Sequence, residues 1–212
     1  MPLLENWIIL PRDFNLNKKT LEGTKENFYS PIVINKFKNF ELVKDNILNL
    51  INKEKIAKPE YIEISEVNIS KSDYHNSYNF DRTWVTSLEK EISENLMTLC
   101  LNLNFYGFKI SNIWFQQYFE NSEHGWHIHA GANYSGVLYL EMPEDGPRTE
   151  FINPSTNEIF SLKMNEGDIA IFPTFALHRS PKNKSKHRKT VVSFNFNFAF
   201  PDERYQDTSK IM

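Results

Sequence analysis

The sequence predicts a mainly β fold in which N-terminal helices cover one face of a sheet. Two observations predict it. After residue 104, short segments of alternating apolar and polar residues recur at regular intervals, and no helical period separates them. Before residue 104, two longer segments carry apolar residues at the spacing of an amphipathic helix. Seven or eight short strands in succession are typical of a β-sandwich or a barrel.

The expected strands share this alternation, and turn residues bound them. They are residues 112–120, 126–130, 135–142, 149–153, 158–163, 168–172 and 189–199. The turn signals between them include Asn121-Ser122, Asn153-Pro154 and Gly167-Asp168. We therefore expect one domain over residues 1–212, with a mixed N-terminal layer (1–104), a β core (105–200) and a C-terminal tail (201–212).

The two expected helices lie in the N-terminal layer. The first spans Phe40 to Ile51, and the second runs from Thr86 or Ser87 to about Leu103. In the second helix we expect Ser87 to be the N-cap, because glutamates fill the turns that follow it.

A strand and a loop complete the N-terminal layer. The alternation of residues 61–65 predicts the strand, and residues 67–84, rich in Asn, Ser, Asp and Tyr, predict a long surface loop.

Composition limits the class of protein. A hydrophobic fraction of 40% and an aromatic fraction of 14% are sufficient for a packed core and exclude a disordered chain. The formal net charge of −3 gives no indication of nucleic-acid or anionic-membrane binding. The single cysteine, Cys100, excludes an internal disulfide and a Cys-rich zinc module. With no transmembrane stretch and no signal peptide in the sequence, we expect a soluble cytoplasmic protein.

Histidines mark the candidate site. Three of the six lie within residues 123–129, and strand alternation directs His127 and His129 to the same face. His178 follows 51 residues after His127, just beyond a segment that reads as a buried strand ending at Pro173. Neutral imidazoles from neighbouring segments can form a three-point facial metal site with open positions. Among the other three histidines, His75 is expected in a loop without a chemical role, and His124 beside the site rather than as a ligand.

A basic segment opens the last strand. Alternation places Arg188, Thr190 and Val192 on one face and directs Lys189 to the other. If the Arg188 face points inward, the guanidinium needs an anionic partner, and a carboxylate matches its fork in a bidentate manner. The neighbouring lysines predict a solvated hairpin, since no aromatic residue interleaves them as in nucleic-acid sites.

These motifs resemble the 2-oxoglutarate- and Fe(II)-dependent oxygenases of the double-stranded β-helix (jelly-roll, cupin-like) fold. The family pattern is His-x-Asp/Glu, a distal His about fifty residues on, and Arg-x-Ser/Thr about ten further. The likeness covers residues 112 to 200, under half the chain, and extends to a branch of small oxygenases in bacteria and phages. The phrases that carry it are His127-Ile128-His129, His178, Arg188-Lys189-Thr190, Trp126-His127, Ser135-Gly136-Val137-Leu138-Tyr139 and Ser193-Phe194-Asn195.

The resemblance implies a non-haem iron hydroxylase that uses Fe(II), 2-oxoglutarate and O2. It implies iron ligands at His127, His129 and His178. It also implies that Arg188 pairs with the distal carboxylate of 2-oxoglutarate, helped by Tyr139 and Thr190, and that Tyr118 lies near its chelating end. The substrate, a small molecule or a peptide, is not indicated, and neither is a homo-oligomeric state. No nucleic acid or membrane partner is expected.

One position departs from the family pattern. His129 stands where the family usually has a carboxylate ligand, so that Fe(II) would keep its full charge of +2. Alternatively Glu123 or Glu141 supplies a carboxylate and His129 lies outside the metal's ligand set. The departure also leaves open a cupin-like three-histidine metalloprotein, acting as an isomerase or cofactor-independent dioxygenase, and a non-catalytic jelly-roll binding protein.

Overall fold

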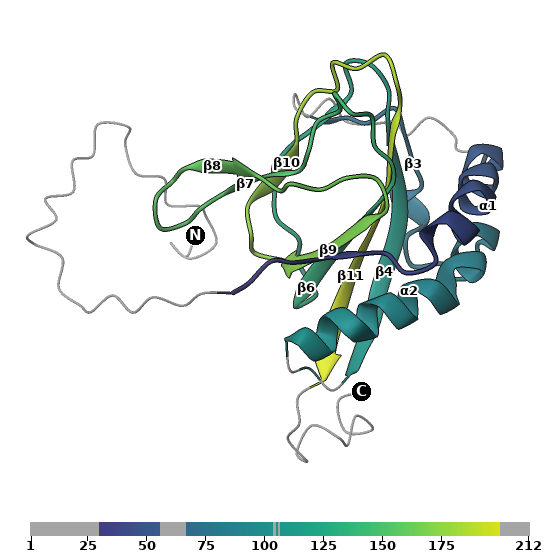
Figure 1. The fold of residues 1–212 in the computed structure, drawn as a ribbon, viewed down its shortest axis with the longest axis horizontal. Coiled ribbons are helices and arrows are strands. Elements are labelled where there is room, and N and C mark those ends of the chain that lie inside the picture. The colour runs from purple at the N-terminus through teal and green to yellow at the C-terminus, as the bar shows by residue number, and fades with distance from the viewer. Residues whose placement is uncertain (1–29, 56–66, 104, 106, 200–212) are drawn as a thin grey trace, which may run out of the picture.

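Two antiparallel sheets lie face to face in the computed structural model, which describes residues 30–55, 67–103, 105 and 107–199 (Figure 1). The larger sheet has the order β1 (Val33–Lys36), β9 (Asp168–Pro173), β6 (Tyr134–Glu141), β11 (Lys189–Ala199), β4 (Gly107–Tyr118) and β3 (Lys71–Ser72). The smaller has the order β2 (Val67–Asn68), β5 (Glu123–His127), β10 (His178–Ser180), β7 (Glu150–Ile152) and β8 (Ile159–Ser161). This is the predicted double-stranded β-helix.

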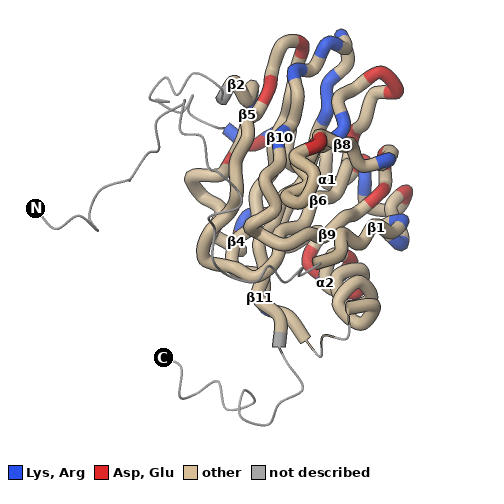
Figure 2. The backbone as a smooth tube through the Cα atoms, turned by 90° about the vertical axis from the view of Figure 1, so that its left-hand side faces the viewer, with Lys and Arg blue, Asp and Glu red and all other residues tan. Residues whose placement is uncertain are grey.

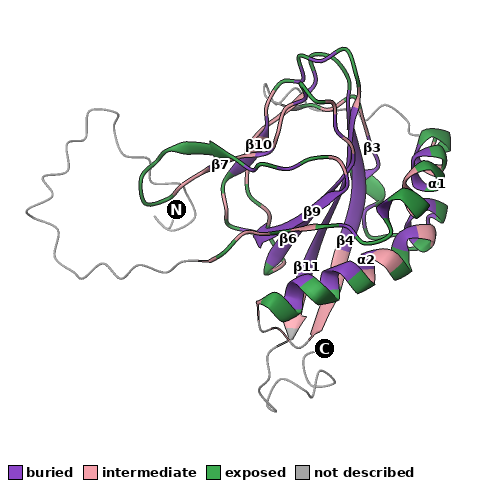
Figure 3. Ribbon diagram, viewed as in Figure 1, coloured by how far each residue is buried: buried purple, intermediate pink, exposed green. Residues whose placement is uncertain are grey.

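Two helices cover the outer face of the larger sheet, α1 (Phe40–Lys53) and α2 (Thr83–Asn102) (Figures 1 and 3). The side chains of this layer form one apolar cluster with outward residues of the sheet. The cluster includes Ile47, Ile51, Leu88, Leu96, Ile113, Phe115, Val192, Phe194 and Phe196. A second cluster, with Val137, Phe151, Phe172 and Val191, lies between the two sheets. The larger sheet is therefore buried on both faces, as Figure 3 shows for β4, β6 and β11.

Most expected elements are present, with shifted ends. The second helix begins at Thr83 rather than Thr86 or Ser87, and its N-cap is Arg82, so the expected N-cap at Ser87 is wrong. The loop over residues 67–84 contains two short strands and a 3₁₀ turn, η3 (Tyr74–Asn76).

Two strands of three or four residues were not predicted, because segments this short do not show a clear alternation of apolar and polar residues. The sequence did not predict β1 and β10. The expected strand at residues 61–65 and the tail at 201–212 lie outside the described residues.

A glycine brings β6 and β11 together. Gly136 pairs with Phe194, and a Cβ atom built at Gly136 would lie 2.1 Å from the Phe194 ring. Any larger residue would displace this ring, which is fully buried against the helical layer. Gly136 therefore keeps β11 in place beside β6.

A buried ion pair holds the segment between β3 and α2 against β4. Asp73 accepts hydrogen bonds from Arg82 Nη1, from Trp84 Nε1 (3.0 Å) and from the Phe115 backbone N–H (2.8 Å). Arg82 Nη2 also donates to the Ile113 carbonyl at 2.6 Å. Both charged residues are buried, so each charge depends on the other for compensation. Because Arg82 is fixed in this way, α2 begins directly after it.

None of the helices in the described part of the chain has an apolar stretch of the length needed to span a bilayer.

Removing one member of the buried pair should destabilise the fold strongly. In Asp73→Ala, Arg82 is left as an uncompensated buried charge, and the free energy of unfolding should fall by about 3–5 kcal/mol. Urea denaturation measures this change. The control is Glu150→Gln, which removes a partly exposed pair with Arg179 and should cost less than about 1 kcal/mol. Equal losses in the two variants would contradict the assignment.

Candidate metal centre

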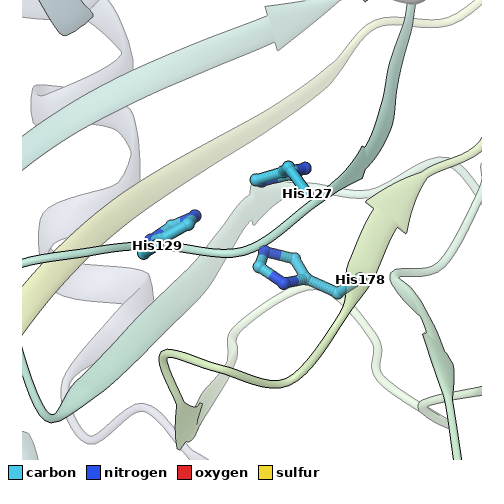
Figure 4. Close-up of side chains that lie close together, drawn as sticks. All are labelled: His127, His129 and His178. Carbon is cyan, nitrogen blue, oxygen red and sulfur yellow. The ribbon is translucent and has the colours of Figure 1, made fainter. Parts of the chain in front are cut away.

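Three histidines converge between the two sheets (Figure 4). His127 ends β5 and pairs directly with His178, the first residue of β10. His129 lies two residues beyond the end of β5, where its backbone N–H donates to the Thr174 carbonyl at 3.0 Å. One ring nitrogen from each histidine lies within 4.8 Å of the others. The structure thus brings together the three residues that the sequence predicted as metal ligands.

Backbone carbonyls fix the orientation of two of the rings. His127 Nδ1 lies 2.8 Å from the Gly125 carbonyl oxygen, and His178 Nδ1 lies 2.8 Å from the Ala176 carbonyl oxygen. A carbonyl only accepts, so each Nδ1 carries the proton and donates it. Each Nε2 therefore keeps a lone pair, which is the form of imidazole that binds a metal.

Asn195 and Ser135 fix the third ring. His129 Nδ1 donates to Asn195 Oδ1 at 2.6 Å, and the Ser135 hydroxyl donates to the same oxygen at 2.7 Å. No role was expected for these two residues from the sequence, although both lie in the phrases that carry the family resemblance. A signal was present in the sequence, since Ser193-Phe194-Asn195 alternates polar and aromatic residues and so places Asn195 on the more polar face of the strand.

Burial keeps the imidazoles neutral. Desolvation, reinforced by the neighbouring histidines, lowers the pKa of His178 to about 3. Burial likewise lowers the pKa of His127 to about 4 and shifts that of His129 downward. His124, whose pKa burial lowers to about 3, stacks on the His127 ring at 3.8 Å and belongs to no metal-binding group among the described residues. At neutral pH the three converging rings can therefore accept a cation without first losing protons.

The carboxylates considered as alternative ligands lie elsewhere. Glu123 pairs with Lys182 at 3.6 Å, and Glu141 accepts hydrogen bonds from Arg188 and Thr190. Neither glutamate lines the cavity at the histidines. Within the described chain the convergent group consists of three imidazoles, so the alternatives with Glu123 or Glu141 are not supported.

The histidines open onto a cavity of about 520 Å³ between the sheets. Trp114, Gln116 and Tyr118, which alternate along β4, line it together with Lys189, Val191, Ser193 and Asn195 of β11. The face of β4 that carries Trp114, Gln116 and Tyr118 therefore borders the cavity.

The orientation expected for β11 is reversed. Arg188 points out of the cavity, where its guanidinium forms a bidentate pair with Glu141 (2.7 and 2.8 Å) and also donates to Asn52 of α1. Thr190 is on the same side and donates to Glu141. Lys189 points inward and is 1% exposed. The expectation that Arg188 and Thr190 face the cavity while Lys189 faces away is therefore corrected.

Packing against the helical layer explains this orientation of β11. Val192, Phe194 and Phe196 continue the Arg188 face along the strand, and they pack against α1 and α2. The opposite face carries Lys189, Ser193 and Asn195, a mixture that suits a solvated cavity better than an apolar core. The aromatic residues at the end of the strand share this face, but only the position of the helices decides that the face points away from the cavity.

Lys189 lies in a cage of aromatic rings and oxygen atoms. Its Nζ donates to the Pro147 carbonyl and to Ser180 Oγ, both at 2.9 Å, and lies 5.2 Å from the Tyr118 ring centroid and 5.3 Å from that of Tyr139. Burial, with a smaller effect from the charge of Arg148, lowers the pKa of Lys189 to about 7. An ammonium has three donors, so these two hydrogen bonds leave one for an acceptor in the cavity.

The two tyrosines predicted for cosubstrate binding differ in position. Tyr118 lines the cavity. Tyr139 is fully buried, and its hydroxyl oxygen accepts a hydrogen bond from the Thr149 backbone N–H at 3.1 Å while also bonding the Thr149 hydroxyl. Burial raises the pKa of Tyr139, so its phenol stays protonated. Thr149, rather than Tyr139, borders the cavity at this point.

This donor set fits an Fe(II) ion and an anionic chelator. Three neutral imidazoles with free Nε2 lone pairs offer three ligand atoms, and an iron site for oxygen chemistry needs open positions in addition. Among the described residues no Asp or Glu lines the cavity, whereas two cations do: Lys189, which is buried, and Arg179, which is paired with Glu150. A carboxylate entering the cavity would find this ammonium without competition from a side-chain acid.

Comparison with known proteins identifies the class. Residues 112–195 match the model of the family described as "Putative 2OG-Fe(II) oxygenase", a segment that spans β4 to β11 and contains the three histidines. The match covers less than half of the chain, and it indicates a 2-oxoglutarate- and Fe(II)-dependent oxygenase, an oxidoreductase whose cofactors would be Fe(II), 2-oxoglutarate and O2. No curated protein matches the sequence.

Solved structures share the fold at low sequence identity. An oxidoreductase of the 2OG-Fe(II) oxygenase family from Burkholderia pseudomallei superposes with a TM-score of 0.58 at 12% identity, covering 78% of this chain and 83% of its own. The viral collagen prolyl hydroxylase of Paramecium bursaria Chlorella virus-1, in complex with 2-oxoglutarate, gives 0.53 at 14%, covering 78% and 96%. HygX from Streptomyces hygroscopicus, with nickel and 2-oxoglutarate bound, gives 0.55 at 8%, covering 78% and 82%.

Loss of the amide that orients His129 should weaken metal binding. In Asn195→Leu the His129 ring loses its acceptor while all three imidazoles remain, and Fe(II) affinity should fall by about 10- to 100-fold. Anaerobic titration calorimetry measures it, and His129→Ala should lose at least as much. The control is His187→Ala, an exposed histidine, which should bind iron like the parent. Parent-like affinity in both Asn195→Leu and His129→Ala would remove His129 from the ligand set.

Proposed function

We propose that the protein is a hydroxylase that couples oxidative decarboxylation of 2-oxoglutarate to oxidation of a substrate C–H bond. In the overall reaction, 2-oxoglutarate, O2 and R–H give succinate, CO2 and R–OH. The observation that carries the proposal is the position of Lys189, a buried cation that opens into the same cavity as the three histidines. A three-histidine protein that uses no carboxylate cosubstrate would have no need of this costly buried charge.

In this proposal the chain's own residues have separate tasks. His127, His129 and His178 hold the iron, which when bound supplies the oxygen and electron-transfer chemistry. The Lys189 ammonium pairs with the distal carboxylate of 2-oxoglutarate. Thr149 and Ser180 lie beside that carboxylate, and the Tyr118 ring forms the adjoining wall. The apolar side chains between the sheets exclude water from the cosubstrate.

Exchanging the charge at Lys189 tests this assignment. Lys189→Met keeps the aliphatic stem and loses the ammonium, so 2-oxoglutarate affinity should fall by about 10- to 100-fold, the value of a hydrogen bond between charged groups. The measurement is anaerobic titration of iron-loaded protein with 2-oxoglutarate, followed by the visible absorption band of the chelate. In air, succinate release without substrate should fall in parallel and recover in part at high 2-oxoglutarate concentration.

The matched control is Arg188→Lys, one residue away on the opposite face. Its 2-oxoglutarate affinity should stay within about 3-fold of the parent, because its partners Glu141 and Asn52 lie outside the cavity. If Arg188→Lys lost the cosubstrate and Lys189→Met kept it, the proposed role of Lys189 would be wrong. If the parent neither bound 2-oxoglutarate nor released succinate, the proposed function itself would fail.

Cosubstrate affinity should depend on pH through Lys189. The free protein loses its buried ammonium as pH rises through about 7, because burial favours the neutral amine. The carboxylate of 2-oxoglutarate requires the ammonium, so affinity should be greatest below pH 7 and decline toward pH 9, with net proton uptake on binding above pH 7. Calorimetry in buffers of different ionisation enthalpy detects this uptake. Lys189→Met should show no such uptake; an equal uptake in that variant would assign the proton elsewhere.

A further inference from the structure

A tryptophan on the cavity wall has a polar group without a partner. Trp114 is 3% exposed, and its indole Nε1–H, which is buried, makes no hydrogen bond with any described residue. An unpaired buried donor costs roughly 1–3 kcal/mol. The ring lines the cavity and lies 5.7 Å from the ring of His129. An unpaired donor this close to the metal ligands is available to a ligand.

A second unpaired polar group lies on the same face of β4. Asn112 is 4% exposed, lines the cavity two residues before Trp114, and its side-chain amide makes no hydrogen bond with a described residue. Gln116, the next residue on this face, is already engaged, because its Oε1 accepts from Ser193 and its Nε2 lies 3.5 Å from His124 Nδ1. The indole N–H of Trp114 and the NH2 and carbonyl groups of Asn112 are thus left unused at one end of the cavity.

This end lies away from the proposed cosubstrate position. In the sheet register Lys189 pairs with Tyr118, whereas Trp114 pairs with Ser193 and Asn112 with Asn195. Four residues along a strand correspond to roughly 13 Å, so the Trp114 end and the Lys189 end can be occupied by different molecules. Figure 2 shows that charged residues gather on the loops and helices, while the chain around β4 and β11 is largely uncharged.

Two exposed tyrosines border this end. Tyr74 and Tyr78, which are 56% and 74% exposed, line the cavity from the segment that the Asp73–Arg82 pair holds against β4. The Tyr74 ring stands edge-on to Trp114 with centroids 5.1 Å apart. Of the two rings in contact with the indole, Tyr74 and His129, only Tyr74 is exposed, so a ligand can reach the indole N–H by displacing the Tyr74 ring.

We propose that Trp114, Asn112 and Tyr74 form the substrate subsite, and that it binds an uncharged amide group carried on an apolar body. The amide carbonyl accepts from Trp114 Nε1–H, and the amide N–H donates to the Asn112 side-chain oxygen. The rings of Tyr74 and Tyr78 cover the apolar part. Of the two charged residues among the described ones that line the cavity, Lys189 lies at the other end and Arg179 is already paired with Glu150, so burial of a charged ligand here would be costly. This inference rests on the proposed function, since it concerns the substrate of the same iron site.

The amide can belong to a peptide or to a small-molecule carboxamide, and two probes distinguish these sources. Full-length protein, loaded with Zn²⁺ in place of iron and saturated with 2-oxoglutarate, is titrated with N-acetyl-leucinamide and with benzamide by saturation-transfer NMR. Their charged counterparts are N-acetyl-leucine and benzoate, which cannot use Lys189 because 2-oxoglutarate occupies it. At least one amide should bind, at least 10-fold more tightly than its acid. Binding of N-acetyl-leucinamide alone assigns a peptide source, and binding of benzamide alone a small-molecule source.

Two variants test the hydrogen bonds. Trp114→Phe keeps an aromatic ring and removes the N–H, and Asn112→Leu removes the amide at similar volume. Each should weaken amide binding by about 3- to 10-fold, the value of one neutral hydrogen bond. Each should leave 2-oxoglutarate affinity as in the parent. Trp126→Phe, a tryptophan that does not line the cavity, is the matched control and should bind the amides like the parent.

Three results would overturn the subsite: binding of neither amide, acids that bind as well as amides, or amide affinity that neither Trp114→Phe nor Asn112→Leu lowers. In all three cases a parent protein that still binds 2-oxoglutarate and releases succinate would keep the proposed function. Absence of 2-oxoglutarate binding in the parent would instead end both proposals, and the two failures are therefore distinguishable.

Discussion

The position of β11 between β4 and β6 is the constraint on which the rest of the site depends. Phe194 and Phe196 on its outward face pack against the apolar sides of α1 and α2. Once those rings point outward, the pleat turns Lys189 and Asn195 into the cavity, since side chains on a strand alternate. One strand thus presents the buried cation at one end and the amide that orients His129 at the other.

The electrostatics of the cavity follow from this arrangement. Burial keeps the histidines neutral, and no carboxylate of the described residues lines the cavity. A bound Fe(II) would therefore keep its full double charge, and the Lys189 ammonium would add a third positive charge to the same cavity. In the proposed function, a cosubstrate with two carboxylates would offset this excess and so take the place of the carboxylate ligand common in the family.

The outer layers of the protein hold the cavity in shape. Arg188, on the far face of the sheet, connects β11 to β6 through Glu141 and to α1 through Asn52. On the other side, the Asp73–Arg82 pair fixes the segment that carries Tyr74. The Arg188 charge, which the sequence suggests for ligand binding, thus serves packing, whereas two groups without a partner among the described residues, Trp114 Nε1–H and the Asn112 amide, lie at the cavity.

The sequence by itself determined the β-rich core, the two helices and the three histidines. These features depend on local periodicity and on motif spacing, both of which are present in the chain order. It did not determine which face of β11 points inward. Alternation fixes that Arg188 and Lys189 point in opposite directions, but both faces mix polar and apolar residues, and only packing against α1 and α2 selects between them. The partners of Asn195 and the unpaired indole of Trp114 were likewise decided by the tertiary structure, because hydrogen bonds between residues far apart in sequence depend on where the sheets bring them together.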